Sequence, residues 1–215
     1  MGPTDGWDDI WLKYHAVNEK KVRHYFETFS FSAVAKDRKI VDIGCGSGEA
    51  LKYLKDRGYS RLKGVEREPR LFGGLDGEMR GMIERGDCLE LDNIGDGFDI
   101  VLIFGVLHHL KTVEDMNLAL RNVKRILKPG GRFYSVEQWK HFIRTAAMKL
   151  VRDTPVGLLG STLRMERKLL ELERVDLGHW LDVEEKITAD AERMGLKPIF
   201  RKKDLRYRYI IFEKQ

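Results

Sequence analysis

The sequence Ile-Val-Asp-Ile-Gly-Cys-Gly-Ser-Gly at residues 40–48 decides the fold of this chain. A short apolar run that carries Asp42 leads into three alternating glycines, Gly44, Gly46 and Gly48, and a helical pattern follows. Glycine lets the backbone turn tightly and approach a ligand closely, and a helix N-terminus favours a carboxylate or phosphate. The stretch therefore predicts a buried strand, a glycine loop and a helix whose first turn faces a nucleotide-like ligand.

The spacing of these glycines separates two classes of nucleotide-binding loop. A dinucleotide fingerprint has its third glycine three residues after the second. Here Glu49 occupies that position, and the third glycine comes one residue early. A dinucleotide-dependent oxidoreductase is therefore disfavoured. The alternation from Asp42 to Gly48 instead resembles the cofactor loop of class I S-adenosylmethionine-dependent methyltransferases.

Four further segments extend this resemblance in the order that the family has them. They are similar to the second strand with its terminal acid, the end of the third strand, the fourth strand with its following turn, and the turn into the fifth strand: residues 62–66, 85–88, 98–110 and 127–133. The chain resembles small class I methyltransferases of the broad type that includes quinone-biosynthesis methyltransferases. The resemblance implies an α/β fold, Rossmann-like and doubly wound, with a mostly parallel seven-stranded sheet and an antiparallel C-terminal strand.

Two segments lie outside the expected alternation of strand and helix in a single domain over residues 1–215. Helical spacing of apolar residues predicts one or two N-terminal helices within residues 1–38. Residues 139–180 predict a helical cap inserted after the fifth strand. Ligands of open α/β sheets sit at the carboxyl edge of the strands, so we expect the cap to help line the substrate pocket. Residues 71–81 hold four glycines, which predicts a short helix or a loop. The third strand is expected over residues 82–87 and the fifth over residues 132–138.

Composition bounds the class of protein. The 215 residues are 34% charged and 10% aromatic, as in a folded domain. The sequence lacks an apolar run of about 18 residues and a basic, apolar N-terminal signal, so we expect a cytoplasmic protein without a membrane span. The two cysteines, Cys45 and Cys88, are too few for a disulfide framework or a metal cluster, so we expect no bound metal.

The net charge of +5 is concentrated at the C-terminus. Residues 197–215 carry seven Lys and Arg residues against two acids, and seven minus two equals the whole excess. Edge strands commonly carry such charges as protection against pairing with other chains, which is the interpretation we favour. The alternative is attraction to an acidic partner such as tRNA.

The resemblance implies a set of residues that bind S-adenosylmethionine. Glu66 is expected to accept hydrogen bonds from the ribose hydroxyls, Asp42 to orient the glycine loop or reach the methionine ammonium, and Asp87 to meet the adenine amino group. The full expected set is Asp42, Gly44, Cys45, Gly46, Glu66, Arg67, Asp87, Cys88 and Phe104.

Two residues are candidate proton acceptors. His108 and His109 follow the predicted fourth strand, and neighbouring side chains cannot share one direction, so at most one should face the pocket. His108 is one candidate base, and Glu137 at the end of the fifth strand is the other. The candidates for the substrate pocket are Tyr14, His15, His109 and Trp139. A base is needed only when the acceptor must lose a proton, because the sulfonium is already an activated methyl donor.

We therefore predict methyl transfer from S-adenosylmethionine to a small-molecule acceptor at oxygen, carbon or nitrogen, by in-line displacement. One alternative is a tRNA methyltransferase that uses the basic C-terminal strands. The turn after the fourth strand lacks the Asn/Asp-Pro-Pro-Tyr signature of amino-group base methylation, so nucleic acid is the less favoured partner. The other alternative is a non-catalytic partner protein that binds S-adenosylmethionine.

Overall fold

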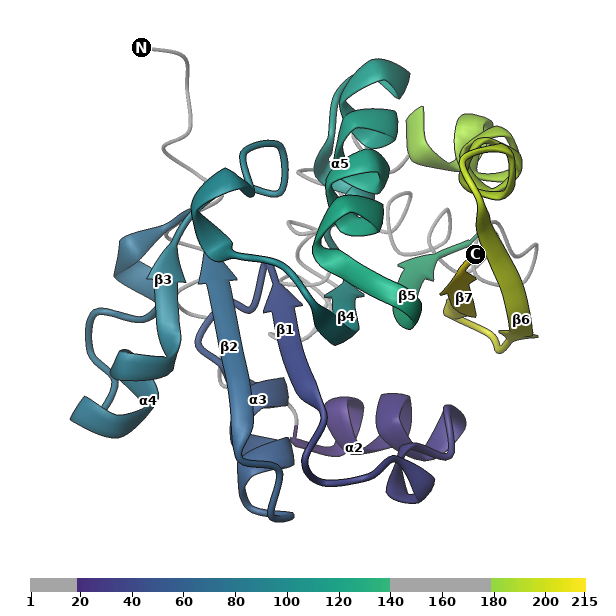
Figure 1. Ribbon diagram of the computed structural model, residues 1–215. Helices are drawn as coiled ribbons and strands as arrows, with labels where there is room; N and C mark the ends of the chain where they lie inside the picture. Colours follow the sequence, from purple (N-terminus) through teal and green to yellow (C-terminus); the bar gives the residue numbers. More distant parts are fainter. Residues whose placement is uncertain (1–18, 140–178) are drawn as a thin grey trace, which may run out of the picture.

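A seven-stranded sheet forms the centre of the computed structural model, which describes residues 19–139 and 179–215 (Figure 1). The order of its strands is β3-β2-β1-β4-β5-β7-β6. Their bounds are β1 Lys39–Ile43, β2 Arg61–Glu66, β3 Ile83–Arg85, β4 Phe98–Phe104, β5 Leu127–Gln138, β6 Leu196–Lys203 and β7 Tyr207–Lys214. Strands β1 to β5 pair in parallel, and β7 runs antiparallel to both β5 and β6. The predicted fold class is confirmed.

Helices cover both faces of the sheet (Figure 1). One face packs against α5 and the helix that covers residues 179–193, and the other packs against α2 and α3. The helices are α2 Glu19–Thr28, α3 Glu49–Lys55, α4 Gly77–Met82 and α5 Val113–Ile126, and the short 3₁₀ turns are η1 Phe31–Ala33, η2 Pro69–Leu71, η3 Asp92–Ile94 and η4 Leu107–His109.

Strand β4 shows why the sheet is buried on both sides. Val101 and Ile103 point toward α5, whereas Ile100 and Leu102 point toward α2 and α3, and all four are buried. Successive side chains of a strand face opposite sides, so a strand covered on both faces needs a continuous apolar run. The run over residues 100–104 meets this requirement, and β4 lies in the middle of the sheet.

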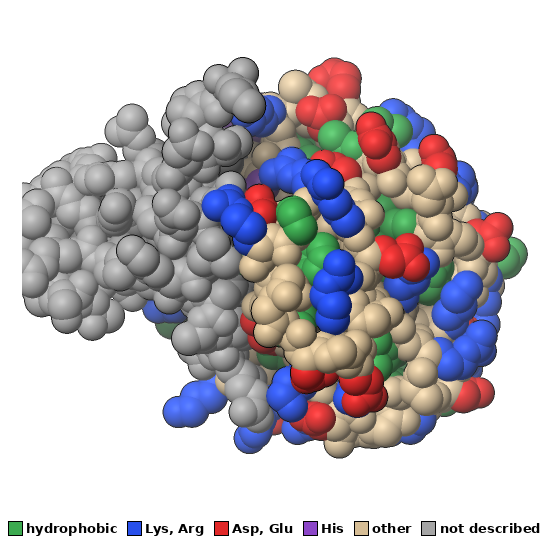
Figure 2. Space-filling model, turned by 90° about the vertical axis from the view of Figure 1, so that its left-hand side faces the viewer, with side chains coloured by type: hydrophobic (Ala, Val, Ile, Leu, Met, Phe, Trp, Pro, Cys, Tyr) green, Lys and Arg blue, Asp and Glu red, His purple; other side chains and the backbone are tan. Residues whose placement is uncertain are grey.

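The glycine-rich segment after β2 contains the short helix that its composition allows. Asp76 caps α4, because its carboxylate accepts hydrogen bonds from the amides of Glu78 at 3.1 Å and Met79 at 2.9 Å. The neighbouring strand β3 has three residues and is shorter than the predicted 82–87. Figure 2 views this side of the molecule, where acidic and basic side chains are interspersed and pairs such as Lys63–Glu84 form at 2.8 Å.

Some predictions fall on residues outside the described part of the chain. These are residues 1–18 of the N-terminal segment, with Tyr14 and His15, and residues 140–178 of the predicted cap. Within the described residues, no helix is both long and apolar enough to cross a membrane. The same residues contain no group of three or more His, Cys, Asp or Glu side chains placed to hold a metal ion.

Candidate functional site

The glycine loop connects the carboxyl end of β1 to the first turn of α3. Gly44, Gly46 and Gly48 have φ angles of 71°, 56° and 80°, which lie in the left-handed region that glycine adopts without strain. A methyl group on Gly44 would overlap the Cγ2 atom of Val106, which belongs to the turn after β4. The loop therefore needs glycine for its backbone conformation, and at Gly44 also for its close contact with that turn.

Glu66 ties the glycine loop to the end of β2. Its Oε2 accepts a hydrogen bond from the amide of Gly46 at 2.8 Å, and its Oε1 accepts one from the amide of Glu68 at 2.9 Å. The side chain is buried, and each carboxylate oxygen keeps a second lone pair for another donor. The carboxylate thus lies beside the loop and can still accept hydrogen bonds from a ligand.

Asp42 is a buried acid that lies among other acids. Burial, together with the nearby charges of Glu49 and Glu66, raises the pKa of Asp42 to about 8. Within the described residues, no cation forms an ion pair with Asp42 or Glu66. Buried charges are normally paired, so this part of the site fits a ligand that brings a positive charge and hydroxyl donors. The ammonium and ribose groups of S-adenosylmethionine have that chemistry.

The end of β3 forms the next part of the same sheet edge. Asp87 Oδ1 accepts from the amide of Leu89 at 3.0 Å, and Asp87 Oδ2 lies 3.6 Å from Nη1 of the exposed Arg67. Asn122 of α5 holds this segment, because its amide nitrogen donates to the carbonyls of Cys88 at 3.1 Å and Leu89 at 2.9 Å. Sequence reasoning missed Asn122, which the pattern of α5 marks only as a polar residue between apolar ones.

Both cysteines pack as small buried side chains. Burial, with a contribution from Asp42, raises the pKa of the Cys45 thiol well above its usual range. Burial next to Asp87 raises the pKa of the Cys88 thiol to about 12. The thiolate is the nucleophilic form of cysteine, so neither residue is prepared for covalent chemistry at neutral pH.

The turn after β4 is held by Glu137 from β5. Its Oε1 accepts hydrogen bonds from the amides of Val106 at 3.0 Å and Leu107 at 2.8 Å, and its Oε2 lies 2.7 Å from Nδ1 of His108. His108 and Glu137 are both buried, with exposed fractions of 4% and 2%. The half-buried His109 has its ring 4.0 Å from the ring of His108. The two candidate bases, which the sequence presents as alternatives, are bonded to each other.

The segment that contains this site is similar to known methyltransferases. Residues 41–135 match the family described as "Methyltransferase domain". A protein of Encephalitozoon cuniculi, named only as a methyltransferase, is 32% identical over 112 residues, which are 51% of this chain and 50% of that protein. A human protein named probable tRNA methyltransferase 9B is 33% identical over 99 residues, which are 43% of this chain and 20% of that protein. The chain thus spans half or less of the length of these curated relatives.

The fold is similar to that of a solved methyltransferase over a longer stretch of the chain. A magnesium protoporphyrin IX methyltransferase of Synechocystis, solved with bound SAH (S-adenosylhomocysteine), superposes with a TM-score of 0.61 at 15% identity, covering 100% of this chain and 90% of that chain. Residues 41–135 of this chain thus match a methyltransferase domain, and the chain shares the fold of that solved methyltransferase. The narrower likeness to quinone-biosynthesis enzymes stays a prediction.

Two predicted site residues make contacts that the sequence does not suggest. The ring of Phe104 packs edge-on against Tyr25 and Phe26 of α2, at centroid distances of 5.4 Å and 5.7 Å. Trp139 donates from Nε1 to the carbonyl of Asp204 at 2.7 Å, in the turn between β6 and β7. Both residues therefore have a packing partner in addition to any role toward cofactor or substrate.

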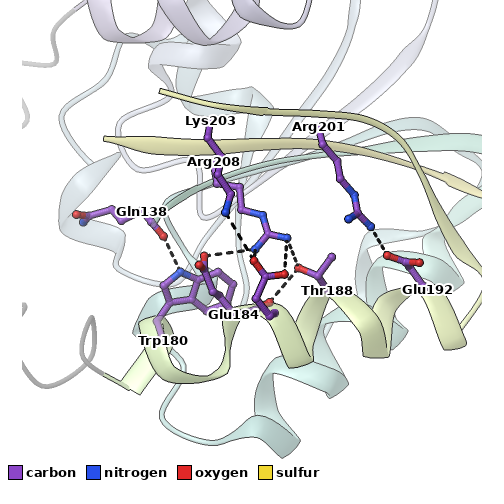
Figure 3. A network of polar contacts seen from close by, with 9 residues as sticks. Gln138, Trp180, Glu184, Thr188, Glu192, Arg201, Lys203 and Arg208 are labelled. Atoms are coloured by element: carbon purple, nitrogen blue, oxygen red, sulfur yellow. Dashed lines mark hydrogen bonds and ion pairs between the residues drawn. The ribbon is translucent and has the colours of Figure 1, made fainter. Parts of the chain in front are cut away.

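The basic C-terminal strands face an acidic helix (Figure 3). Arg208 of β7 is buried and lies 3.5 Å from Glu184, 3.2 Å from Glu185 and 3.0 Å from the hydroxyl of Thr188. Arg201 pairs with Glu192, and Lys203 lies 3.7 Å from Glu185. Three of the seven basic residues at the C-terminus thus form ion pairs with acids of the helix over 179–193.

Glu184 is incompletely paired in this network. Its Oε2 lies within ion-pair distance of Arg208 but forms no directed hydrogen bond within the described residues. Burial raises the pKa of Glu184 even though Arg208 opposes that change. Trp180 closes the same end of the helix by donating from Nε1 to the carbonyl of Gln138 at 2.8 Å. These contacts connect the helix to β5 and β7.

Proposed function

We propose that this chain transfers the methyl group of S-adenosylmethionine to a small-molecule acceptor. The observation that carries the proposal is the buried acidic site beside the glycine loop, where Asp42 and Glu66 have no described cation as a partner. When bound, the cofactor supplies an activated methyl group on its sulfonium. The contribution of the chain is to bind both reactants, hold the acceptor in line and exclude water.

The roles of individual residues follow from where they lie. Asp42 would oppose the positive charge of the methionine end, and Glu66 would accept hydrogen bonds from the ribose hydroxyls through its remaining lone pairs. Asp87 would accept from the adenine amino group. The other proposed contacts are Gly44, Cys45 and Gly46 at the methionine end, Arg67 and Cys88 at the adenine end, and Phe104.

The internal pairing of the basic C-terminal residues supports a small acceptor over tRNA. An RNA-binding surface needs cations that are free to neutralise phosphates. Arg208 is buried, and Arg201 and Lys203 have acidic partners, so the field of this strand pair is reduced. The relative named as a tRNA methyltransferase favours the other acceptor class, which we keep as the second candidate function.

The experiment that tests the proposal is calorimetry followed by a substrate screen. S-adenosylmethionine and S-adenosylhomocysteine should bind, and NAD should not. NAD binding without a response to S-adenosylhomocysteine would refute the proposal. A metabolite extract incubated with methyl-labelled cofactor, and read by mass spectrometry, then identifies the acceptor. Cofactor binding without turnover on extracts or on total tRNA would instead favour the non-catalytic partner protein.

The tRNA alternative has its own measurement. Binding of total tRNA to the full chain should be weak and should disappear at moderate salt, because the contacts would be a few exposed cations. Tight, structure-selective tRNA binding that persists at physiological salt would promote the second candidate over the first.

A further inference from the structure

We propose that Glu137 fixes His108 as the proton acceptor of the methyl-transfer reaction, with the proton of the imidazole on Nδ1 and Nε2 left to accept. The inference rests on the proposed function and narrows it, since it names the class of acceptor. His108 would be the catalytic residue, and Glu137 would be a positioning residue that acts through it.

The hydrogen bonds of Glu137 determine the tautomer of His108. Both oxygens of the carboxylate are occupied, Oε1 by the amides of Val106 and Leu107 and Oε2 by Nδ1 of His108. An ionised carboxylate only accepts hydrogen bonds, so Nδ1 of His108 must carry the hydrogen. In a neutral imidazole the other nitrogen, Nε2, is then the acceptor.

The position of the turn brings this nitrogen to the edge that holds the cofactor loop. Val106, two residues before His108, packs so closely on Gly44 that no side chain fits there. Within the described residues no hydrogen bond engages Nε2, and 4% of the His108 surface is exposed. The titratable or charged groups near the pair include His109 in the same turn, Tyr25 of α2, and Arg208, which lies opposite Glu137 on β7.

The chemistry of such a base selects the acceptor. An acceptor with a hydroxyl or N–H group gives its proton to Nε2 while its lone pair bonds to the methyl carbon. The carbon–sulfur bond breaks, and its electron pair stays on sulfur. The imidazolium that forms is stabilised by the carboxylate of Glu137, as in other carboxylate–histidine pairs. We therefore expect acceptors whose oxygen or nitrogen still carries a proton at neutral pH, such as a phenol or an amine.

The variant Glu137→Gln tests the tautomer without removing the support of the turn. Its amide oxygen can still accept from Val106 and Leu107, which turns its NH₂ group toward His108. Nδ1 must then accept, and the proton moves to Nε2. Long-range ¹H–¹⁵N NMR of histidine-labelled protein should report a proton on Nδ1 in the wild type and on Nε2 in the variant. A wild-type protein with the proton on Nε2 would overturn the proposal.

A second readout asks whether Nε2 lies at the cofactor site. Diethyl pyrocarbonate should modify His108 at Nε2 in the wild type, as mapped by mass spectrometry of peptides. With S-adenosylhomocysteine at about ten times its dissociation constant the rate should fall about tenfold, because only the free protein reacts. His24, which is exposed and pairs with Asp204 at 3.1 Å, serves as the internal control and should react equally in both samples.

Calorimetry of S-adenosylhomocysteine on the same samples separates the two proposals. Binding of S-adenosylhomocysteine without protection of His108 overturns only the assignment of the base. Absence of binding overturns the proposed function and the inference with it. A proton on Nδ1, protection of His108 and an inverted tautomer in Glu137→Gln together support the pair as proposed.

Discussion

The glycine-loop site and the C-terminal network of Arg208 with the helix over 179–193 both contain buried acids. Only the second places a cation beside them. Near the loop, Asp42 and Glu66 meet backbone amides and other carboxylates. In the C-terminal network, Glu184 and Glu185 meet Arg208. A buried charge without a counter-charge is unfavourable in the free protein. The difference indicates that the first region is completed by a ligand, whereas the acids of the second already have a cation in the chain that docks their helix on the sheet.

The largest expected effect is a change in how stability depends on pH when Asp42 is replaced. The pKa of Asp42 rises on folding from its ordinary 3.8 to about 8 because of burial and the nearby acids. The folded protein then binds more protons than the unfolded chain across this window, so the contribution of Asp42 to stability falls as pH rises. The free energy of unfolding of Asp42→Asn, taken relative to that of the wild type, should therefore increase by on the order of 5 kcal/mol between pH 4 and pH 9.

Urea unfolding of the ligand-free protein at several pH values measures this difference. Asp99→Asn is the matched control of opposite sign. Burial would raise the pKa of Asp99, but hydrogen bonds from Lys128, the amide of Lys39 and Arg38 hold that pKa at about 2. Ionised Asp99 stabilises the folded protein above the ordinary carboxyl pKa, and this stabilisation is lost as pH falls toward 2. Asp99→Asn should therefore lower the free energy of unfolding at neutral pH. Parallel pH curves for Asp42→Asn and the wild type would contradict the proposed acidic site.

Breaking the C-terminal network should have the next largest effect. Arg208→Leu leaves Glu184 buried without its cation and should lower the free energy of unfolding by about 3–5 kcal/mol. Removing Glu184 as well, in Arg208→Leu/Glu184→Leu, should recover much of this loss. The control Arg201→Leu removes an exposed pair with Glu192 and should change stability by about 0–1 kcal/mol. Equal effects of the two arginine variants in urea unfolding would show that burial does not set the difference.

The contact between the glycine loop and the turn after β4 is expected to be somewhat less costly to disturb. Gly44→Ala combines a left-handed φ angle with an overlap at Val106 and should lower the free energy of unfolding by about 2–4 kcal/mol. Gly58→Ala has a similar φ angle of 83° but open space around it, so it should lose only about 1–2 kcal/mol. If both variants lose the same amount, the contact with Val106 contributes nothing.

The smallest expected effect concerns cofactor affinity. Glu66→Gln keeps the shape of the side chain but removes its charge, and should weaken binding of S-adenosylhomocysteine by about 1–3 kcal/mol. Glu84→Gln, on the neighbouring strand and exposed, should leave the dissociation constant unchanged. An unchanged constant for Glu66→Gln in calorimetry would show that this carboxylate only supports the loop.

Local sequence signals account for most of the fold. The glycine spacing after β1, the apolar run of β4 and the Thr112 cap of α5 are each readable from a few neighbouring residues, because turn geometry, strand burial and helix capping are local. The strand β3 and the start of β5 at Leu127 differ from the predicted bounds, since their ends depend on pairing with other strands.

The sequence by itself therefore determined the resemblance to methyltransferases, the mostly parallel sheet that it implies and the residue types at the glycine loop. Only the tertiary structure decided which charges meet. It joined Glu137 to His108 and paired Arg208 with Glu184, and it placed Val106 against Gly44. These partners are far apart along the chain or belong to different elements, and no periodicity links them. Their contacts arise when parallel strands align their carboxyl ends and helices pack on a sheet, which fixes side-chain distances that composition and spacing leave open.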